Sequence, residues 1–461
     1  MSIQPGELRW RIACAAILVL GLCAAGVAGQ EPQQENQQKQ DQETDQGKLR
    51  WLAEHAVAVR SAVPADEDFS DLMPLVTWIG TSRVVALGEA THGDGAALAA
   101  KARLVRFLHQ KMGFDMLAWE SGYFDVRLMD AALRGDVPLP EAASRGLYKI
   151  WWKSTEVQPV FAYLRATQAT AHPMQSIGFD CRVSTEESRA KGFPAFLFEF
   201  FDRLDPALIS PQERADLTKM SVGLLPVDVY EHPGERIYNR DLPRRLVSVI
   251  DQRRADLLVR SNPREIDDVR QSLISFMSMD RALGGRAGTG HEDGYSRDTA
   301  MAENLLWLLQ GPLAGRKVIV WAHNYHLMRD FPDISAAGAA ESPVKERSSA
   351  GAGAMGIHLG RALGRDYYTI GFVTHHGSSG FAGDAPEVFP AADPASFEGL
   401  LHAVGKPQLF LALRDLPADH WLRAPLASGF YFHDPQVTNM PRIYDAVFFI
   451  DEMTPSHAVI P

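Results

Sequence analysis

Short, uninterrupted runs of apolar residues recur along this chain and constrain its fold more than any other feature. Several are continuous rather than alternating, as expected for strands covered by other structure on both faces. Between them lie stretches of helical spacing, such as residues 96–111, which Gly113 ends. This alternation predicts an α/β fold with three α/β/α layers and a mostly parallel sheet. The predicted strands are residues 84–87, 116–119, 175–179, 318–322, 367–372, 408–413 and 446–450.

The region from about residue 194 to residue 310 departs from this rhythm. It contains no convincing strand, and its charged stretches, such as 242–259 and 266–283, carry apolar residues at helical spacing. We therefore expect a helical insertion at about 194–310, between the third and fourth strands. Such an insertion would either cap a site or support the sheet.

The first residues are predicted to be a targeting segment rather than part of the fold. Arg9 and Arg11 precede an apolar run that ends in small residues, so residues 1–29 are expected to be a signal peptide. An uncleaved membrane anchor is the alternative. Residues 30–48 are rich in glutamine and predict a disordered linker, which leaves residues 49–461 as the folded domain. The mature protein is thus expected to be exported.

Charge and cysteine content narrow the partners. The 461 residues carry a formal net charge of −11. This balance argues against nucleic acid and against anionic membranes as partners, because both attract clustered positive charge. Apart from export or an N-terminal anchor, a small molecule is the expected partner, and the oligomeric state stays open. Cys181 is the one cysteine outside the leader, so no disulfide is expected.

Three of the predicted strands run directly into acidic or imidazole side chains. In parallel sheets, ligands bind just outside the carboxyl ends of the strands, so side chains at these ends are expected to share one site. Such a site suits an enzyme. The residues are Glu89 and His92 after the first strand, Glu120 after the second, and His323 and His326 after the fourth.

The spacing of Glu89 and His92 allows the carboxylate to lie beside the imidazole. A carboxylate bound in this way fixes the tautomer of the ring and raises its basicity, which makes a general base near neutral pH. The competing interpretation is a helix cap at Thr91 with a buried, structural His92. His323 and His326 would share one face if a helix begins directly after their strand.

Other chemistries remain open at this stage. Two glutamates with paired imidazoles also suit a zinc or manganese site, although the His-Glu-x-x-His spacing is absent. Cys181 is more simply a small buried residue than a nucleophile. Residues 377–380 do not match the Gly-x-Ser-x-Gly nucleophile motif. His375 follows the predicted strand 367–372 and is expected at the same edge of the sheet, where it is either a substrate contact or part of a solvated loop.

The order of its motifs makes the chain resemble the erythromycin esterase family from about residue 49 to residue 456. The resemblance implies hydrolysis of the lactone ester of 14-membered macrolides, without a required metal, by a histidine that activates water. The motifs are Gly88-Glu-Ala-Thr-His-Gly93, Lys101-x-Arg103, Gly113-Phe114 with Trp119-Glu120, Arg297-Asp298, Met301-Ala302-x-Asn304, Trp321-Ala-His-Asn-x-His326, Met355-Gly356, Leu363-Gly364 and Tyr444-Asp445-Ala446.

The resemblance also implies roles for individual residues. His92 would be the base and Glu89 its support, while Glu120, His323 and His326 would line and polarise the same cleft. We expect Arg103 and Arg297 to contact the substrate directly or through another side chain. The other two expected substrate contacts are Asn324 and His375.

The sequence therefore predicts a hydrolase of carboxylic esters, with macrolide lactones as one candidate class. Water activated by His92 would attack the carbonyl carbon, and no cofactor or metal is expected. The first alternative is a metal-dependent hydrolase whose ligands are the same glutamates and histidines. The second is a catalytically silent, exported protein that binds a bulky neutral molecule.

Overall fold

The computed structural model describes residues 44–223, 241–286, 296–331 and 353–459. The predicted signal peptide and residues 30–43 of the predicted linker lie outside these ranges, so export stays a prediction. Within them, no helix combines the length and the apolar character needed to cross a membrane. The chain divides into two units, residues 1–56 and 57–461, which are described separately.

The described part of the first unit is one helix, α3 (Asp45–His55), and it corrects the predicted linker. Thr44 caps the helix, because its hydroxyl oxygen accepts a hydrogen bond from the backbone N–H of Gly47 at 3.0 Å. Residues 45–48 are thus helical rather than disordered. The compact second unit begins at Val57, eight residues after the predicted start of the domain at residue 49.

The second unit contains a nine-stranded sheet with the order β1-β8-β11-β6-β2-β5-β3-β4, and β7 pairs with β6. The six strands from β11 to β4 are all parallel, which confirms the predicted α/β class and mostly parallel sheet. The strands are β1 (Val57–Ala58), β2 (Val84–Leu87), β3 (Met116–Gly122), β4 (Gln175–Asp180), β5 (Val318–Trp321), β6 (Tyr367–Ser379), β7 (Glu387–Phe389), β8 (Gln408–Ala412) and β11 (Ala446–Met453).

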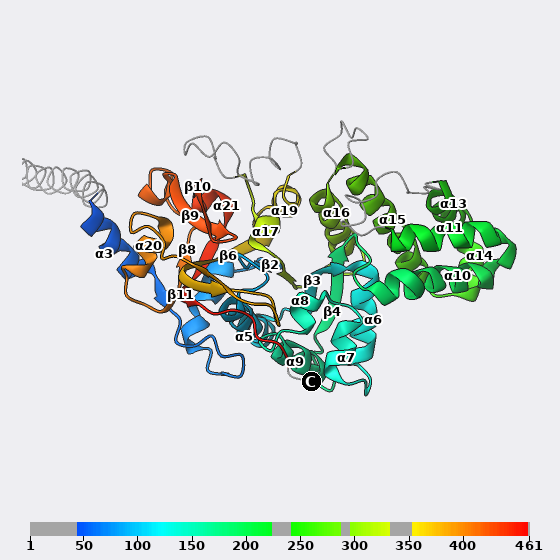
Figure 1. Ribbon diagram of the computed structural model, residues 1–461, viewed down its shortest axis with the longest axis horizontal. Helices are drawn as coiled ribbons and strands as arrows, with labels where there is room; N and C mark the ends of the chain where they lie inside the picture. Colours follow the sequence, from blue (N-terminus) through cyan, green and yellow to red (C-terminus); the bar gives the residue numbers. More distant parts are fainter. Residues whose placement is uncertain (1–43, 224–240, 287–295, 332–352, 460–461) are drawn as a thin grey trace, which may run out of the picture. The chain divides into compact units, whose positions relative to one another are not determined.

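Helices cover both faces of this sheet, as Figure 1 shows. On one face, α5 and α9 pack over the large apolar core that includes Leu98, Phe107 and Phe161. Gly113 ends α5 in the left-handed conformation, with φ of 70°. The helices of the first face and of the chain between β3 and β4 are α4 (Pro74–Ile79), α5 (Gly95–Met112), α6 (Tyr123–Leu133), α7 (Leu139–Ser144), α8 (Lys149–Trp152) and α9 (Gln158–Thr167).

The opposite face carries helices from the second half of the chain. Among them, α17 begins immediately after β5 and packs against β6 and α19. The site residues of this half therefore belong to short elements held against the sheet. The helices are α16 (Arg297–Gln310), α17 (Asn324–Leu327), α19 (Met355–Leu363), α20 (Phe397–His402) and α21 (Met440–Ile443).

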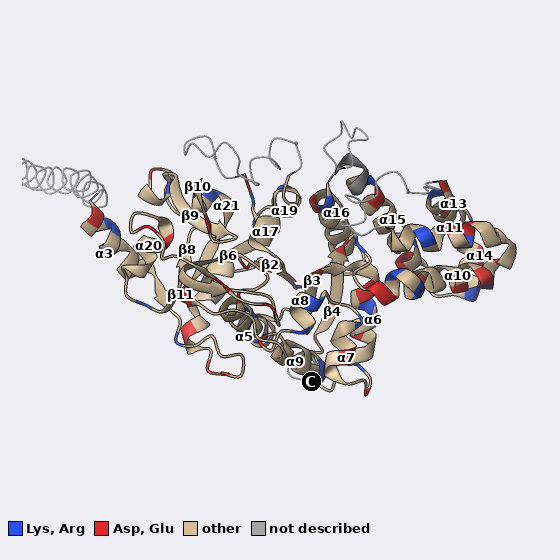
Figure 2. Ribbon diagram, viewed as in Figure 1, with Lys and Arg blue, Asp and Glu red and all other residues tan. Residues whose placement is uncertain are grey.

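Between β4 and β5 the described residues form helices alone. They enclose a second apolar core that includes Phe200, Leu246 and Phe276. Figure 2 shows Lys, Arg, Asp and Glu distributed along these helices, whereas the strands of the sheet are nearly free of them. The helices that precede α16 are η2 (Ser188–Gly192), α10 (Phe193–Leu204), η3 (Pro206–Leu208), α11 (Pro211–Val222), α13 (Asp241–Gln252), α14 (Arg254–Arg260) and α15 (Pro263–Arg286).

A two-stranded hairpin, β9 (Leu426–Tyr431) and β10 (Asp434–Thr438), was not anticipated from the sequence. Tyr431 pairs with Asp434, so Phe432 and His433 alone form the turn. Both adopt the left-handed conformation, with φ of 52° and 58°. Turns of this kind favour Asn-Gly, and each side chain in this conformation costs about 1–2 kcal/mol. The surrounding structure must therefore hold the turn in place.

Candidate active site

Strands β2, β5 and β3 are neighbours, and their carboxyl ends are level. Leu87 and Trp119 both pair with Trp321. The acidic and imidazole residues that follow these positions therefore emerge side by side. Gly88 makes this possible, because a Cβ on it would lie 2.0 Å from the side-chain oxygen of Asn324. Only glycine leaves room for the chain to leave β2 here.

His92 and Glu89 form the first pair of the site. The Nδ1–H of His92 donates to Glu89 Oε1 at 2.9 Å, which leaves Nε2 as the unprotonated nitrogen of the neutral ring. Burial lowers the pKa of His92, as do His326 and Arg297, against the opposing charges of Glu120 and Asp94. The side chain of His92 is still 22% exposed. His92 is thus a neutral base that an entering molecule can reach.

Glu89 is held from its other side by Lys101 of α5. The ammonium donates to Glu89 Oε2, and both side chains are fully buried. The ammonium also lies 4.2 Å from the ring centroid of Trp321. Burial lowers the pKa of Lys101 well below its usual value, and Glu120 opposes this effect. Removal of one member of a buried pair leaves the other uncompensated, so Lys101 helps to keep the carboxylate beside His92.

Glu120 and Asp180 hold the guanidinium of Arg297 between them. Its Nη2 donates to Glu120 Oε1 at 2.9 Å and to Asp180 Oδ2 at 2.7 Å. Glu120 Oε2 accepts the backbone N–H of His323 at 3.0 Å. Although burial alone would raise the pKa of Glu120, His326 and Arg297 lower it well below its usual value. Glu120 is therefore an ionised acceptor whose oxygens are already engaged.

His326 lies between two carboxylates and is the cationic member of the site. Its Nδ1–H donates to Asp298 Oδ1 at 2.6 Å and its Nε2–H to Glu120 Oε1 at 3.1 Å. Burial opposes the charge, but these two carboxylates raise the pKa of His326 to about 9. Arg297 Nη1 lies 3.2 Å from His326 Nε2. A doubly protonated ring accepts no hydrogen bond, so this is a contact between two cations that both donate to Glu120.

His323 is neutral and has one free donor. Its Nδ1 accepts the backbone N–H of Tyr325 at 3.0 Å, which places the proton on Nε2. That nitrogen is buried without a hydrogen-bond partner among the described residues. Burial lowers the pKa of His323 well below its usual value, His92 and His326 add to this, and Glu120 opposes it. An unsatisfied buried N–H is costly unless a ligand pairs with it.

Aromatic rings surround the two neutral histidines. The rings of His92 and His323 meet edge to face with centroids 5.4 Å apart, and Trp151 packs on His92 at 5.2 Å. Phe432 lies over His323 at 5.0 Å, although its own side chain is 51% exposed. The unprotonated Nε2 and the free Nε2–H thus belong to rings in direct contact, beside an apolar surface.

The turn formed by Phe432 and His433 binds residues 90–94, the segment that carries His92. The backbone N–H of Phe432 donates to Ala90 O at 3.1 Å, and His433 Nε2 lies 2.9 Å from Asp94 Oδ1. These contacts offset the unfavourable backbone conformation of both residues. Strain of this type is concentrated at functional sites, and here it presents the ring of Phe432 to His323.

Arg103 does not have the predicted contact with substrate. It is 1% exposed, and its guanidinium donates to Asp71 Oδ1 at 2.8 Å and to Ser61 O at 2.6 Å. These partners belong to the segment before α4. The residue lies two positions after Lys101 and points to a different side of α5. Arg103 therefore anchors this segment to α5.

Asn324 is also structural. Its Nδ2 donates to Phe372 O at 2.7 Å and to Phe430 O at 2.8 Å, while its Oδ1 accepts from Phe372 N at 3.0 Å. The side chain is fully buried and its hydrogen-bonding groups are occupied. Asn324 thus joins α17 to β6 and β9 instead of contacting substrate. Arg297 contacts Glu120 and His326, so its position fits a residue that acts through other side chains.

His375 lies beside His376, His402 and Asp451 rather than in this cluster. The ion pairs of the site argue against the metal-dependent alternative. Lys101 pairs with Glu89 and Arg297 pairs with Glu120, and these two carboxylates would have to serve as metal ligands. In the part of the chain that the structure describes, the ligand atoms that converge belong to His375, His376 and Asp451.

Sequence reasoning missed the residues that set the charges of the site. Lys101 and Asp298 belong to the motifs of the family resemblance but received no role, and Asp180 directly follows the third predicted strand, residues 175–179. An acidic residue at the end of a further predicted strand was the signal for Asp180. Nothing local marked Phe432, because its position depends on a hairpin that is distant in the sequence.

The fold is α/β, and the family and the relatives that match this chain indicate a hydrolase. The chain belongs to the erythromycin esterase family, whose profile matches residues 109–453. The matched range includes Glu120, Arg297, His323 and His326, and it begins after Glu89 and His92.

Individual relatives agree with this assignment. The putative hydrolase YbfO of Bacillus subtilis is 23% identical over 427 residues, which cover 88% of this chain and 91% of the relative. Erythromycin esterase type II of Escherichia coli is 23% identical over 401 residues, which cover 80% and 89%. A mutant of erythromycin esterase EreC in its open conformation has the same fold, with a TM-score of 0.62, 18% identity and coverage of 88% and 99%.

Proposed function

We propose that this chain hydrolyses carboxylic esters by attack of a water molecule that His92 deprotonates. One observation carries the proposal: a ring with an unprotonated Nε2 is in contact with a ring whose Nε2–H has no partner among the described residues. A base beside an unused donor suits a reaction in which water attacks a carbonyl whose oxygen becomes negative.

In this reaction the water oxygen forms a bond to the carbonyl carbon while a water proton passes to His92 Nε2. Glu89 accepts the Nδ1–H and so stabilises the imidazolium that results. The bond from the carbonyl carbon to the alkoxy oxygen then breaks. His92 returns its proton to that oxygen, which leaves an acid and an alcohol.

His323 is the proposed donor to the oxyanion. Its Nε2–H is already oriented, because Tyr325 N–H occupies Nδ1 and Glu120 binds the backbone N–H. His326 has a different part, since both its N–H groups are bound by carboxylates. Its positive charge favours the developing negative charge and keeps His323 neutral.

The proposed substrate class is a neutral ester with a sizeable apolar part. Phe432 offers an exposed ring next to His323, and Trp151 contacts His92. Erythromycin esterase type II, a relative whose name states a macrolide substrate, supports the lactone esters of macrolides as one candidate. The identity of 23% leaves the specific ester to experiment.

A direct screen tests the proposed function. The purified full chain is incubated with macrolides and with a series of simple esters that differ in the size of the acyl group. We expect a product heavier than the substrate by one water for lactones, and an acid plus an alcohol for open esters. Binding of these compounds without any such product over a long incubation would contradict an esterase and favour a silent binding protein.

The pH dependence of kcat/KM should be bell-shaped. His92 must be unprotonated to act, and burial lowers its pKa, so the rate should rise with pH through a midpoint below the usual histidine value of about 6.5. His326 must stay protonated, so the rate should fall as pH increases through about 9. Initial rates across this range, on an ester that is itself stable there, provide the measurement. An acidic midpoint above 6.5 would contradict the assignment of His92.

A further inference from the structure

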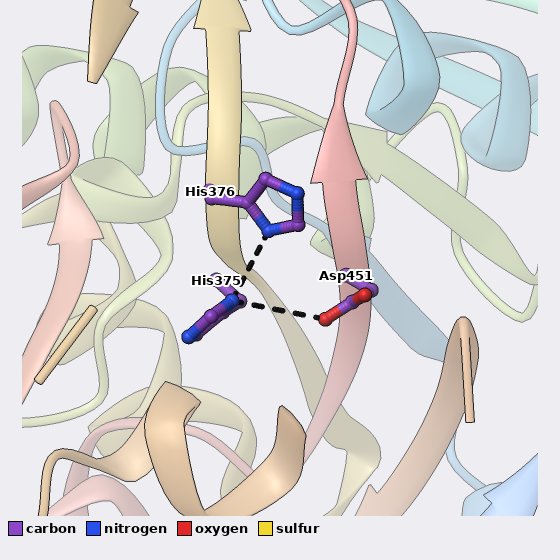
Figure 3. Close-up of side chains that lie close together, drawn as sticks. All are labelled: His375, His376 and Asp451. Carbon is purple, nitrogen blue, oxygen red and sulfur yellow. Dashed lines mark hydrogen bonds and ion pairs between the residues drawn. The ribbon is translucent and has the colours of Figure 1, made fainter. Parts of the chain in front are cut away.

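Three side chains that could hold a metal ion lie together near the carboxyl end of β6. His375 and His376 belong to β6, and Asp451 belongs to the neighbouring parallel strand β11. Figure 3 shows the two imidazole rings and the carboxylate turned toward one another. No hydrogen bond, ion pair or ring contact found among the described residues joins these three to His92 or His323. The cluster is therefore separate from the proposed active site.

The distances in this cluster suit a common ion. His375 Nδ1 lies 3.1 Å from His376 Nδ1 and 3.9 Å from Asp451 Oδ1. Two ligand atoms bound to one zinc ion at about 2.0–2.2 Å lie at most about 4.4 Å apart. All three ligand atoms lie within 4.8 Å of one another, so rotation of the side chains can bring them to the distances that an ion requires. Asp451 is part-exposed, which leaves its carboxylate room to turn.

The strands and a neighbouring helix hold the ligands in place. Thr374 and His376 pair with Ile450 and Glu452, so Asp451 lies directly beside His375 in the sheet. His402 of α20 stacks on His375 with ring centroids 3.8 Å apart, and its Nδ1 lies 2.6 Å from Asp451 Oδ1. A partner that orients a ligating carboxylate is typical of built metal sites.

The chemistry of the donors selects the kind of ion. Two imidazole nitrogens with one carboxylate oxygen favour zinc and similar transition metals over calcium or magnesium, which prefer oxygen ligands. Imidazoles bind metals only when the ligating nitrogen is unprotonated.

We propose that His375, His376 and Asp451 bind one divalent transition-metal ion of the zinc class, which links β6 to β11. Three protein ligands leave one position of a tetrahedral ion for water. The ion would stabilise the sheet beyond the active site and take no part in ester hydrolysis. Binding to the folded chain alone would raise the temperature of unfolding.

Titration with Co²⁺ and Zn²⁺ tests this proposal on the full chain without a histidine tag, after treatment with a chelator and dialysis. Calorimetry gives the stoichiometry, and Co²⁺ adds a visible absorption band that reports its ligands. We expect one tight site in the wild type and a higher unfolding temperature with Zn²⁺. The double variant H375Q/H376Q and the single variant D451N should each bind about tenfold more weakly or worse.

His457→Gln is the matched control, because this surface histidine pairs with Glu156 away from the cluster. It should bind metal like the wild type. Unchanged affinity in the double variant and in D451N would overturn the proposal, and so would the absence of saturable binding by the wild type. Ester hydrolysis is measured separately with and without chelator, so failure of this proposal is distinguishable from failure of the proposed hydrolase activity.

Discussion

Replacement of His92 by asparagine should reduce kcat for ester hydrolysis by about 10²–10⁴-fold, the range that general base catalysis contributes. Asparagine can keep the hydrogen bond to Glu89, because its side-chain amide donates from nearly the same place as Nδ1. It has no group at the position of Nε2. The variant therefore removes the base while it leaves the buried pair of Glu89 and Lys101 intact.

Steady-state rates with the best ester from the screen measure this effect, together with the unfolding temperature. Because the side chain of His92 is 22% exposed, His92→Ala should also recover part of its activity when free imidazole is added. His457→Asn, a surface substitution, should hydrolyse the ester like the wild type. A folded His92→Asn variant with the rate of the wild type would exclude His92 as the base.

The second large effect is expected at His323, where two substitutions separate its two nitrogens. His323→Asn keeps an acceptor for Tyr325 N–H but removes the donor at Nε2, so kcat should fall by about 10²–10³-fold. His323→Gln places an amide N–H near the former Nε2 and loses the acceptor at Nδ1. The glutamine variant should thus be less stable but more active than the asparagine variant.

Single-turnover rates distinguish loss of the donor from weaker substrate binding, since an oxyanion donor acts on the chemical step. We expect KM to change little in His323→Asn while kcat falls. Thermal unfolding of both variants tests the hydrogen bond from Tyr325 N–H to His323 Nδ1, which caps α17. If His323→Asn had the kcat of the wild type, the buried Nε2–H would have a role other than oxyanion stabilisation.

The sheet could be predicted from the sequence because its strands are continuous apolar runs. Residues 84–87 were expected as a strand and match β2, and residues 318–322 match β5 to within one residue. Parallel strands covered on both faces must be apolar throughout, so hydrophobicity alone marks them. The edge strand β1 has only two residues, and the hairpin β9–β10 mixes polar with apolar positions, so neither stood out.

The composition of the site was predictable, but its protonation was not. Glu89 and His326 follow strand ends and Glu120 lies near the end of β3, and these positions are visible in the sequence. The charge of His326 depends on Asp298, which approaches from α16, and on Glu120. Likewise, the buried amide of Asn324 has the residue type of a substrate contact, and only the fold shows that backbone groups occupy it.

The turn at Phe432 and His433 tolerates substitution differently from the residues that hold His92. His92 is held by Glu89, which forms a buried ion pair with Lys101, so substitutions at these residues are expected to reduce both stability and catalysis. The turn belongs to the hairpin β9–β10, and its contacts with the segment that carries His92 use the backbone of Phe432 and the side chain of His433. The exposed ring of Phe432 makes neither contact, so a different side chain at position 432 can change the surface beside His323 and leave both contacts in place. Substitution at position 432 is thus expected to change which molecules fit beside His323 with little effect on folding.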